Sequence, residues 1–419
     1  MLESLRNALK VTELKTKLLY TLGMIFVFRL GAHVPVPGVI PERFVELVSS
    51  GMIFGFFDII SGGALKNFSI FAMGVMPYIN ASIIMNLLTS VIPHLERLAK
   101  EGEEGRKKIT EYTRYFTVVL AFVQGLGMVI GVRGAVENPS PMNYIMVAVT
   151  ITAGTTFLMW MGEQITEKGI GNGISLLIFA GIVSRVPSGA VQLFEYLNAG
   201  TINVLSIVGL LIIGGLVIAG VVAIQQGQRR IPVQYAKRVV GRRIYGGQTT
   251  HLPLKVNQAG VIPIIFASSL LMFPETIAHW FANSSVAAFY VQYFGWGSAS
   301  HTLIYALLII GFTYFYTAII MNPADVADNI KKYGGFIPGL RPGRPTAEYI
   351  NRIMSRVTLA GAIFLALIAI LPNFVLLATR IPNIYFGGTA LLIVVGVALD
   401  TMKQVESHLL MRSYQGFIK

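Results

Sequence analysis

The sequence predicts an all-α integral membrane protein with ten transmembrane helices in two inverted five-helix halves, and a short re-entrant helix after the first span. Three observations support this prediction. Of the 419 residues, 54% are hydrophobic and only 13% are charged, whereas soluble domains carry roughly 25% charged residues. Apolar runs of nearly spanning length recur along the chain, and the basic residues gather on one side when loops are assigned to alternate sides. An ordinary soluble fold is therefore excluded.

Ten apolar runs are candidate membrane spans, since a helix crosses the hydrocarbon core with about 20 mostly apolar residues. Well inside these runs the only Lys, Arg, Asp or Glu is Arg29, and Arg185 lies at the edge of the fifth run. The runs cover residues 18–36, 70–92, 115–132, 143–162, 172–186, 202–224, 257–274, 302–321, 357–377 and 382–399.

A shorter apolar stretch, 54–68, follows the first span and is interrupted by polar residues and glycines, among them Asp58, Gly62, Gly63 and Lys66. It is too short to cross the bilayer. We expect a re-entrant or surface helix here.

The charge distribution gives the orientation. Lys and Arg number 33 against 20 Asp and Glu, a net charge of +13, and such an excess usually lies in loops that are not translocated. Alternating the loops places nearly all of it on one side, together with the basic tail 1–17. We therefore expect cytoplasmic termini, and a retained tail in place of a cleaved signal peptide.

The ten spans form one membrane domain, 1–419, that divides at an expected external loop. The first half is 1–186, the loop is 187–201 and the second half is 202–419. Because five is an odd number, the second half enters from the opposite face, which permits an inverted repeat around a central pathway. The halves share no convincing sequence similarity, so the repeat rests on this parity alone.

Two cytoplasmic loops, 225–256 and 322–350, are longer than a connection requires, and such loops are usually functional or disordered. The first holds seven basic and no acidic residues, and the second contains the turn-forming run 336–343. Basic pairs of this kind dock RNA phosphate or an acidic protein surface; the alternative is that they only set the topology and contact anionic lipid. The pairs are Arg229 and Arg230, Lys237 and Arg238, and Arg242 and Arg243.

No motif indicates catalysis, a cofactor or a metal. The run 168–173, KGIGNG, resembles a phosphate-binding turn but lacks the Gly-Lys-Ser/Thr ending. A close turn between two helices, with Gly where backbones approach, explains it better. Neither H-E-x-x-H nor G-x-S-x-G occurs, and there is no Cys. The sequence therefore predicts a protein that is not an enzyme.

The spans also lack the central Asp, Glu or His that ion-coupled transporters use, and offer the amides Asn86, Gln124 and Asn257. These fit hydrogen bonds between helices of roughly 1 kcal/mol each, or, if they face one another, a separable polar seam. Val75, Ile79 and Ile83, and separately Ile174 and Ile178, follow helical spacing. Spacing alone favours packing or lipid contact over a place in a pore.

Long stretches of the chain resemble the bacterial SecY family, the channel subunits of the Sec protein translocase. They include FRLGAHVPVPG at 28–38, SGGALKNFSIFAMGVMPYINASIIMNLL at 61–88 and GEQITEKGIGNGIS at 162–175. GQRRIPVQYAKR from 227, THLPLKVNQAGVIPIIFASS from 250, NPADVADNIKKYGGFIPGLRPG from 322 and YFGGTALLIVVG from 385 follow in the same order. The stretches cover most of the chain.

The resemblance implies roles for individual residues. The constriction ring falls on Val75, Ile79, Ile174, Ile178, Ile265 and Ile393, with Val75 where many relatives have Ile. The plug falls on Phe57, Asp58, Ile59, Ile60, Ser61, Gly62, Gly63, Ala64, Leu65 and Lys66. Asn86, Gln124 and Asn257 fall at the lateral gate, between the second and third helices on one side and the seventh and eighth on the other. Arg242, Arg243 and Arg341 fall at ribosome or SecA docking positions.

The resemblance also implies a function. The family member would be a passive channel in the bacterial cytoplasmic (inner) membrane that passes unfolded secretory polypeptides and releases apolar segments sideways into lipid. Its expected partners are the small subunits SecE and SecG, the SecA motor ATPase, the ribosome with its rRNA and proteins, signal peptides, nascent chains and anionic lipids. The alternative is a secondary transporter of a small solute, which the ten-span inverted topology also permits.

Overall fold

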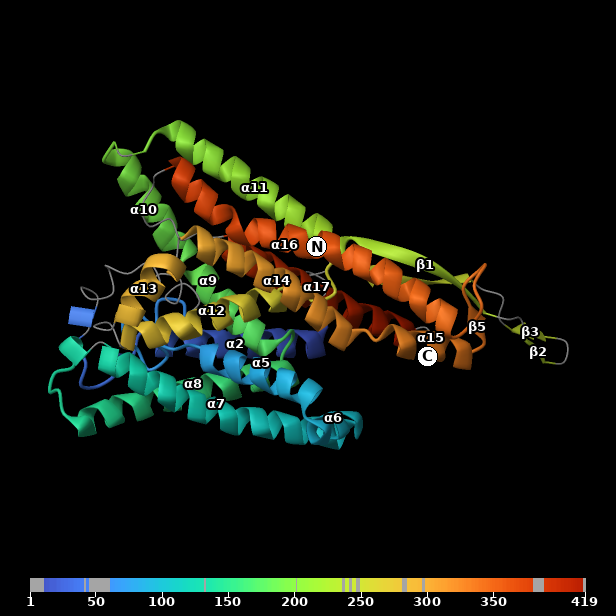
Figure 1. Ribbon diagram of the computed structural model, residues 1–419, viewed down its shortest axis with the longest axis horizontal. Helices are drawn as coiled ribbons and strands as arrows, with labels where there is room; N and C mark the ends of the chain where they lie inside the picture. Colours follow the sequence, from blue (N-terminus) through green and yellow to red (C-terminus); the bar gives the residue numbers. More distant parts are fainter. Residues whose placement is uncertain are drawn as a thin grey trace.

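The computed structural model describes residues 11–40, 43–44, 61–131, 133–200, 202–235, 238–240, 243–245, 249–280, 285–295, 298–379 and 388–416. Helices dominate it, as Figure 1 shows, and most of them run nearly parallel to its long axis. The helical membrane fold predicted from the apolar runs is confirmed.

Each of the ten predicted spans contains a helix. The first five are α2 (Thr12–Gly31), α5 (Met76–Val91), α7 (Glu103–Gly131), α8 (Pro141–Lys168) and α9 (Gly173–Ser184). The second five are α11 (Val204–Gln226), α12 (Ile262–Trp280), α14 (Ala299–Ile320), α16 (Arg344–Thr379) and α17 (Gly388–Gly416). We call these the first and second helix sets.

Shorter elements lie between them. They are α6 (Pro93–Lys100), the 3₁₀ turn η1 (Arg133–Ala135), α10 (Val186–Asn198), α13 (Ser285–Phe294) and α15 (Pro323–Lys332). Among the described residues, six helices are long and apolar enough to cross a membrane, or up to seven if α5 and α6, bent by 98° at their junction, form one span. One of the six is α9 taken together with α10, because α9 alone has only 12 residues.

The two sets lie side by side. In Figure 1, α2, α5, α7 and α8 lie on one side, α11, α14, α16 and α17 on the other, and α9 and α12 between them. Within the sets α7 packs on α5 and α8, and α14 on α12 and α16. Large apolar side chains on the outside, such as Leu205 and Leu216 of α11, are exposed, as expected of surfaces that face lipid tails.

The structure differs from the predicted span boundaries around the second helix. We expected helix from residue 70, but residues 61–75 form turns and α5 begins only at Met76. Gly62, Gly63 and Gly74 all have positive φ in this stretch, a conformation that glycine adopts at little cost and that ends a helix. Of the expected re-entrant helix, the described part from Ser61 onward is turn; residues 54–60 lie outside the described residues.

The expected external loop 187–201 is mostly helical, because α10 covers Val186–Asn198. Pro187 occupies the first turn of α10, where proline is tolerated. Apolar residues at 191, 194 and 197 recur at helical spacing. This spacing is a helix signal in the sequence of the loop.

The two long loops contain strands that were not predicted, and one sheet pairs the loops with one another. The strands are β1 (Gln228–Tyr235), β2 (Arg238–Val240), β3 (Arg243–Tyr245), β4 (Thr249–Lys255) and β5 (Gly335–Phe336). An antiparallel sheet has the order β4-β1-β5, and β2 pairs with β3 in a separate ribbon. Since β1 and β4 come from the first loop and β5 from the second, the sheet joins the loops; Tyr235 lies opposite Gly335.

A small apolar core holds this sheet to the bundle. Ile231, Val233 and Leu254 of the first loop are buried against side chains of the second loop and of α16, namely Ile330, Ile337 and Ile350. In Figure 1 the strands, α15 and α6 lie toward one end of the bundle, whereas α10 and α13 lie toward the other. We call these the strand end and the α10 end.

Candidate pore constriction, plug contacts and loop surface

The six residues that the family resemblance places in a ring come together in the structure. Val75 immediately precedes α5, Ile79 lies on α5, Ile174 and Ile178 lie on α9, Ile265 on α12 and Ile393 on α17. Val75, Ile79, Ile178 and Ile393 are between 3% and 6% exposed and belong to one apolar cluster, against which Ile174 and Ile265 pack. The predicted ring residues therefore lie on or directly beside two helices from each set.

The six predicted ring residues carry no polar groups on their side chains. All six side chains are aliphatic, so none can donate or accept a hydrogen bond to water or to a peptide. A hydrophobic constriction of this kind blocks a pore by excluding water. Ile83, which the sequence placed on the same helix face, is buried in the same cluster, and its burial rules out contact with lipid.

The described part of the plug segment packs between α2 and α9. Arg29 Nη1 of α2 donates a hydrogen bond of 2.6 Å to the carbonyl oxygen of Gly62. A Cβ on Gly62 would lie 2.8 Å from Cα of Gly181 on α9, and one on Gly63 would lie 3.1 Å from the guanidinium carbon of Arg185. Both positions therefore require glycine, because the backbone has a positive φ there and because neighbouring atoms leave little room for a Cβ.

The predicted plug segment also contributes to the cluster that contains the predicted ring residues. Ala64 is fully buried in the same apolar cluster as Ile79 and Ile178. Its neighbour Leu65 donates its backbone N–H to Ser61 Oγ at 3.2 Å. The remaining predicted plug residues Phe57, Asp58, Ile59 and Ile60 lie outside the described residues.

The three predicted gate amides do not form a hydrogen-bonded seam. All three lie in the described part of the chain, and no hydrogen bond joins any two of them. Asn257 precedes α12, contrary to the prediction that it lies within a span; it is 5% exposed and its Nδ2 donates to the Gly260 carbonyl oxygen at 2.9 Å. Asn86 and Gln124 are half-buried on α5 and α7, the helices against which α12 packs.

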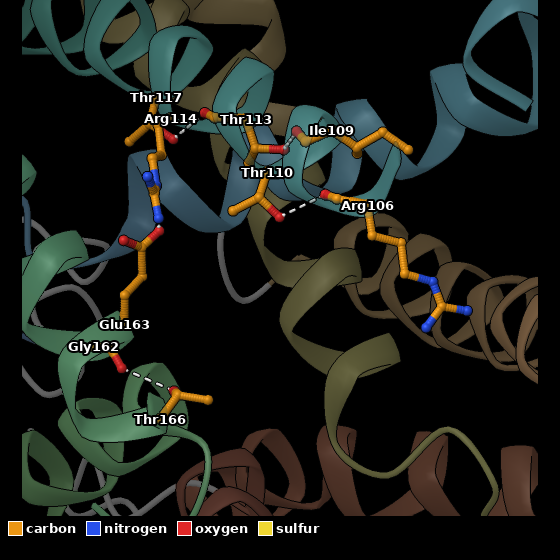
Figure 2. Close-up of polar contacts among 9 residues, drawn as sticks. All are labelled: Arg106, Ile109, Thr110, Thr113, Arg114, Thr117, Gly162, Glu163 and Thr166. Carbon is orange, nitrogen blue, oxygen red and sulfur yellow. Dashed lines mark hydrogen bonds and ion pairs between the residues drawn. The ribbon is translucent and has the colours of Figure 1, made fainter. Parts of the chain in front are cut away.

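An ion pair that sequence reasoning missed joins the third and fourth helices. Figure 2 shows Arg114 of α7 directed at Glu163 of α8, with 2.8 Å between Nε and Oε1. The side chains are 46% and 22% exposed. Arg106, two turns earlier on α7, points away from this pair in Figure 2. A cation and a carboxylate at the ends of two adjacent apolar runs were the available signal.

The loop surface carries exposed basic residues at the strand end. Arg229 and Arg230 on β1 are exposed, as is Arg341 in the second loop. The β1–β5 pairing and the shared apolar core bring these two loops together. Arg238 and Arg243 lie on the paired strands β2 and β3, and Lys237 and Arg242 lie outside the described residues.

Comparison with known proteins gives the family. A family model described as SecY matches residues 69–402. The chain belongs to the SecY family. The protein translocase subunit SecY of Halalkalibacterium halodurans is 52% identical, with 100% of both chains covered. That of Escherichia coli is 47% identical over 97% of this chain and 94% of the relative.

Solved channel structures agree with the fold. A SecY structure concerned with how the plug domain stabilises the closed channel covers 94% of this chain and 92% of its own, with a TM-score of 0.69 at 20% identity. Sec61 in a canine ribosome–channel complex has a TM-score of 0.66 at 19% identity, with the same shares covered. At identities of 20% and 19% these matches show similarity of fold alone.

The family resemblance pointed to some of the contacts in the structure but not to others. It placed six residues in a ring. In the structure four of them belong to one large apolar cluster, and Ile174 and Ile265 pack against it. Neither the resemblance nor the spacing pointed to the bond from Arg29 to Gly62, although Arg29 was the one charge well inside a predicted span. A buried or half-buried charge inside a membrane protein usually has a partner and a role, and that rule would have selected it.

Proposed function

We propose that this chain is the central channel subunit of a protein translocase, which passes unfolded polypeptides across the membrane and releases apolar segments sideways into lipid. The observation that carries the proposal is the ring: six aliphatic side chains from four separate helices meet in one buried cluster. Its members come from both helix sets, so relative movement of the sets opens or closes it. No chemistry is required of the chain for this activity.

The ring suits a polypeptide as cargo. An extended chain carries donors and acceptors along its whole backbone, and an aliphatic wall offers these groups no competing partner. The cargo is then not retained by hydrogen bonds as it slides. Flexible aliphatic side chains also close around cargo of varying width and hold back water and ions.

The plug and the lateral gate complete this proposal. The segment Phe57 to Lys66 would block the pathway on the α10 side of the ring, where Ala64 contacts the ring cluster. The gate would lie where α12 packs against α5 and α7, with Asn86, Gln124 and Asn257 beside it. An apolar helix of about 20 residues gains free energy by leaving through such a gap into lipid.

Energy and orientation come from partners in this proposal. The strand end would face the cytoplasm of a bacterial cell, with both termini on that side of the inner membrane. Its cationic loops, with Arg229, Arg230, Lys237, Arg238, Arg242, Arg243 and Arg341, would dock a ribosome or the SecA motor. SecE and SecG would contact the apolar outer faces, and anionic lipids would contact the basic residues near the strand end. A Sec61 relative has been solved bound to a ribosome, and complementary charge favours the same here.

The domain boundaries follow from the same proposal. The first half would be 1–186 and the second 202–419, joined by 187–201, which now includes most of α10. Each half then contributes two helices to the ring. The halves would act as two rigid bodies.

The test places one polar substitution in the ring. We expect Ile178→Ser to raise the resting ion conductance of the protein in planar bilayers severalfold, because a hydroxyl lets water enter the constriction. Ile212→Ser on the exposed face of α11 is the control and is expected to leave conductance unchanged. Equal conductance for both variants, or saturable ion-coupled uptake of a small solute by proteoliposomes, would count against the channel.

A further inference from the structure

The turn between α8 and α9, residues 169–172, holds the two helix sets together at the strand end, and the proposed function assigns it no role. It belongs to the KGIGNG run. The prediction that this run is a close turn between helices is confirmed: α8 ends at Lys168 and α9 begins at Gly173. Its surroundings include helices from both sets.

From the first set, α2 holds the turn by one hydroxyl. Thr21 Oγ1 donates to the Lys17 carbonyl oxygen at 2.9 Å and accepts the backbone N–H of Ile170 at 3.1 Å, so both of its capacities are used. A Cβ on Gly169 would lie 2.4 Å from the same oxygen. Only glycine therefore lets the turn approach α2 this closely.

From the second set, α17 holds the next residue of the turn. Gln404 Oε1 accepts the backbone N–H of Gly171 at 2.9 Å, across 233 positions of sequence. Gly171 has φ +88°, and a Cβ there would lie 3.2 Å from Thr401 Oγ1. Between the two hydrogen bonds Ile170 is buried with Leu14 of α2 and Val405 of α17. The turn thus joins α2 and α17 by polar and apolar contacts together.

The sets also meet where α12 packs against α5 and α7. No hydrogen bond or ion pair joins α12 to either of these helices among the described side chains. Helices that no such bond joins can slide or separate without leaving hydrogen-bonding groups unpaired. The two contacts between the sets therefore differ: hydrogen bonds hold the 169–172 turn to α2 and α17, whereas none joins α12 to α5 or α7 among the described side chains.

The second attachment also has a geometric consequence. At its far end, α9 continues through α10 to α11, which connects the sets covalently at the α10 end. The turn lies at the opposite end of α9, about 18 Å away for 12 residues at 1.5 Å each. A rigid body held at one point can rotate in any direction, whereas one held at two points rotates about a single axis.

We infer that Gln404 and Thr21 are positioning residues: by holding the 169–172 turn they supply the second of two pivot points, so that the helix sets rotate about an axis along α9. This inference rests on the proposed function. Ile174 and Ile178 of α9 lie beside the axis. Opening of the channel then moves Val75 and Ile79, at the start of α5, away from Ile265 of α12. The pathway widens on the side that faces α12.

Pairs of spin labels test the pivot, and the absence of Cys from the chain makes the labelling specific. One pair, Thr16→Cys with His408→Cys, uses exposed positions on α2 and α17 beside the turn. The other, Val118→Cys with Leu270→Cys, uses exposed positions on α7 and α12. Distances come from double electron–electron resonance in lipid nanodiscs. An apolar 20-residue Leu/Ala peptide with two N-terminal lysines serves as the opening probe.

In the resting protein we expect a narrow distance distribution for the α2–α17 pair. Gln404→Ala removes the acceptor of one hydrogen bond and is expected to enlarge the longer-distance population about fivefold. Gln404→Glu keeps an acceptor oxygen at that position and is expected to restore the narrow distribution. Glu406→Ala, an exposed residue on the same helix, is expected to change nothing. These measurements do not depend on whether the chain conducts polypeptides.

The probe separates a pivot from a merely stabilising contact. We expect the peptide to lengthen the α7–α12 distance while leaving the α2–α17 distance unchanged, and Gln404→Ala to let both change. The inference is overturned if Gln404→Ala combined with Thr21→Val leaves the resting α2–α17 distribution narrow. It is equally overturned if the peptide lengthens both distances in the unsubstituted chain.

Discussion

Replacing Arg29 by Met is expected to release the plug segment from α2. The substitution keeps a long, flexible side chain and removes the 2.6 Å hydrogen bond to the Gly62 carbonyl oxygen. Hydrogen bonds from charged donors contribute about 1.5–3 kcal/mol, and the half-buried guanidinium suggests the lower end, about 1.5 kcal/mol. That free energy corresponds to roughly a tenfold larger population of displaced plug.

Two assays report that population. Resting conductance in planar bilayers should rise about tenfold if the displaced state is the leaking one. In an Ala64→Cys background, the rate of maleimide labelling should rise by the same factor, because Ala64 is fully buried in the resting structure. The factor appears in both measurements only if the same opening exposes the introduced thiol and admits ions.

The controls separate the hydrogen bond from charge and helix stability. Arg29→Lys keeps a cation with a shorter reach and should give an intermediate rise. Lys17→Met, on the same helix and within 3.6 Å of Glu13 of the preceding turn, should leave both rates unchanged. If Arg29→Met labels and leaks no faster than Lys17→Met, the bond does not hold the plug and the reasoning fails.

Three further predictions concern packing, an ion pair and the loop surface. Gly173→Ala would place a Cβ 1.9 Å from the Gly162 carbonyl oxygen and should cost about 1–3 kcal/mol in thermal unfolding; Gly209→Ala, with open space around it, is the control and should cost nothing measurable. A double-mutant cycle with Arg114→Ala and Glu163→Ala should give a coupling of about 1 kcal/mol, because the pair is partly exposed; a coupling near zero would mean that the pair does not fix α7 to α8. Reversing Arg229, Arg230 and Arg341 to Glu should abolish co-sedimentation with ribosomes, and wild-type binding should weaken as salt is added; Lys403→Glu on α17 is the control, and normal binding by the triple variant would remove the loop surface from docking.

The membrane helices were predictable because their signal is local. Each apolar run can be recognised from about 20 consecutive residues, and every predicted span contains a helix. Boundaries were less accurate where glycines with positive φ delayed the start of α5 to Met76, since glycine in an apolar run is also common inside membrane helices. Ile231 and Val233, two residues apart on β1, are both buried. This alternation of apolar residues is a strand signal in the sequence, which the seven basic residues of the loop obscured.

The candidate site was not predictable from spacing, because it is assembled from separate helices. Ile79 and Ile178 lie far apart in the sequence. The periodicity within α5 or within α9 does not predict that the apolar faces of these two helices meet. Family resemblance supplied that information. The same limit applies to Arg114 with Glu163, and to Gly171 with Gln404, which lies across 233 positions. In each case only the folded structure places the two residues together.

The length of α16 has a mechanical consequence for any partner bound at the strand end. Its 36 residues extend about 54 Å, whereas the hydrocarbon core is about 30 Å thick, so the helix projects well beyond the lipid and its first turns carry Ile350 against the sheet. Within the bundle it packs along α14, where Tyr314 donates its hydroxyl to the Ser355 carbonyl oxygen at 3.0 Å. A load applied to these loops would therefore act on the projecting end of α16 and, through the packing of α16 on α14, would tilt the second helix set.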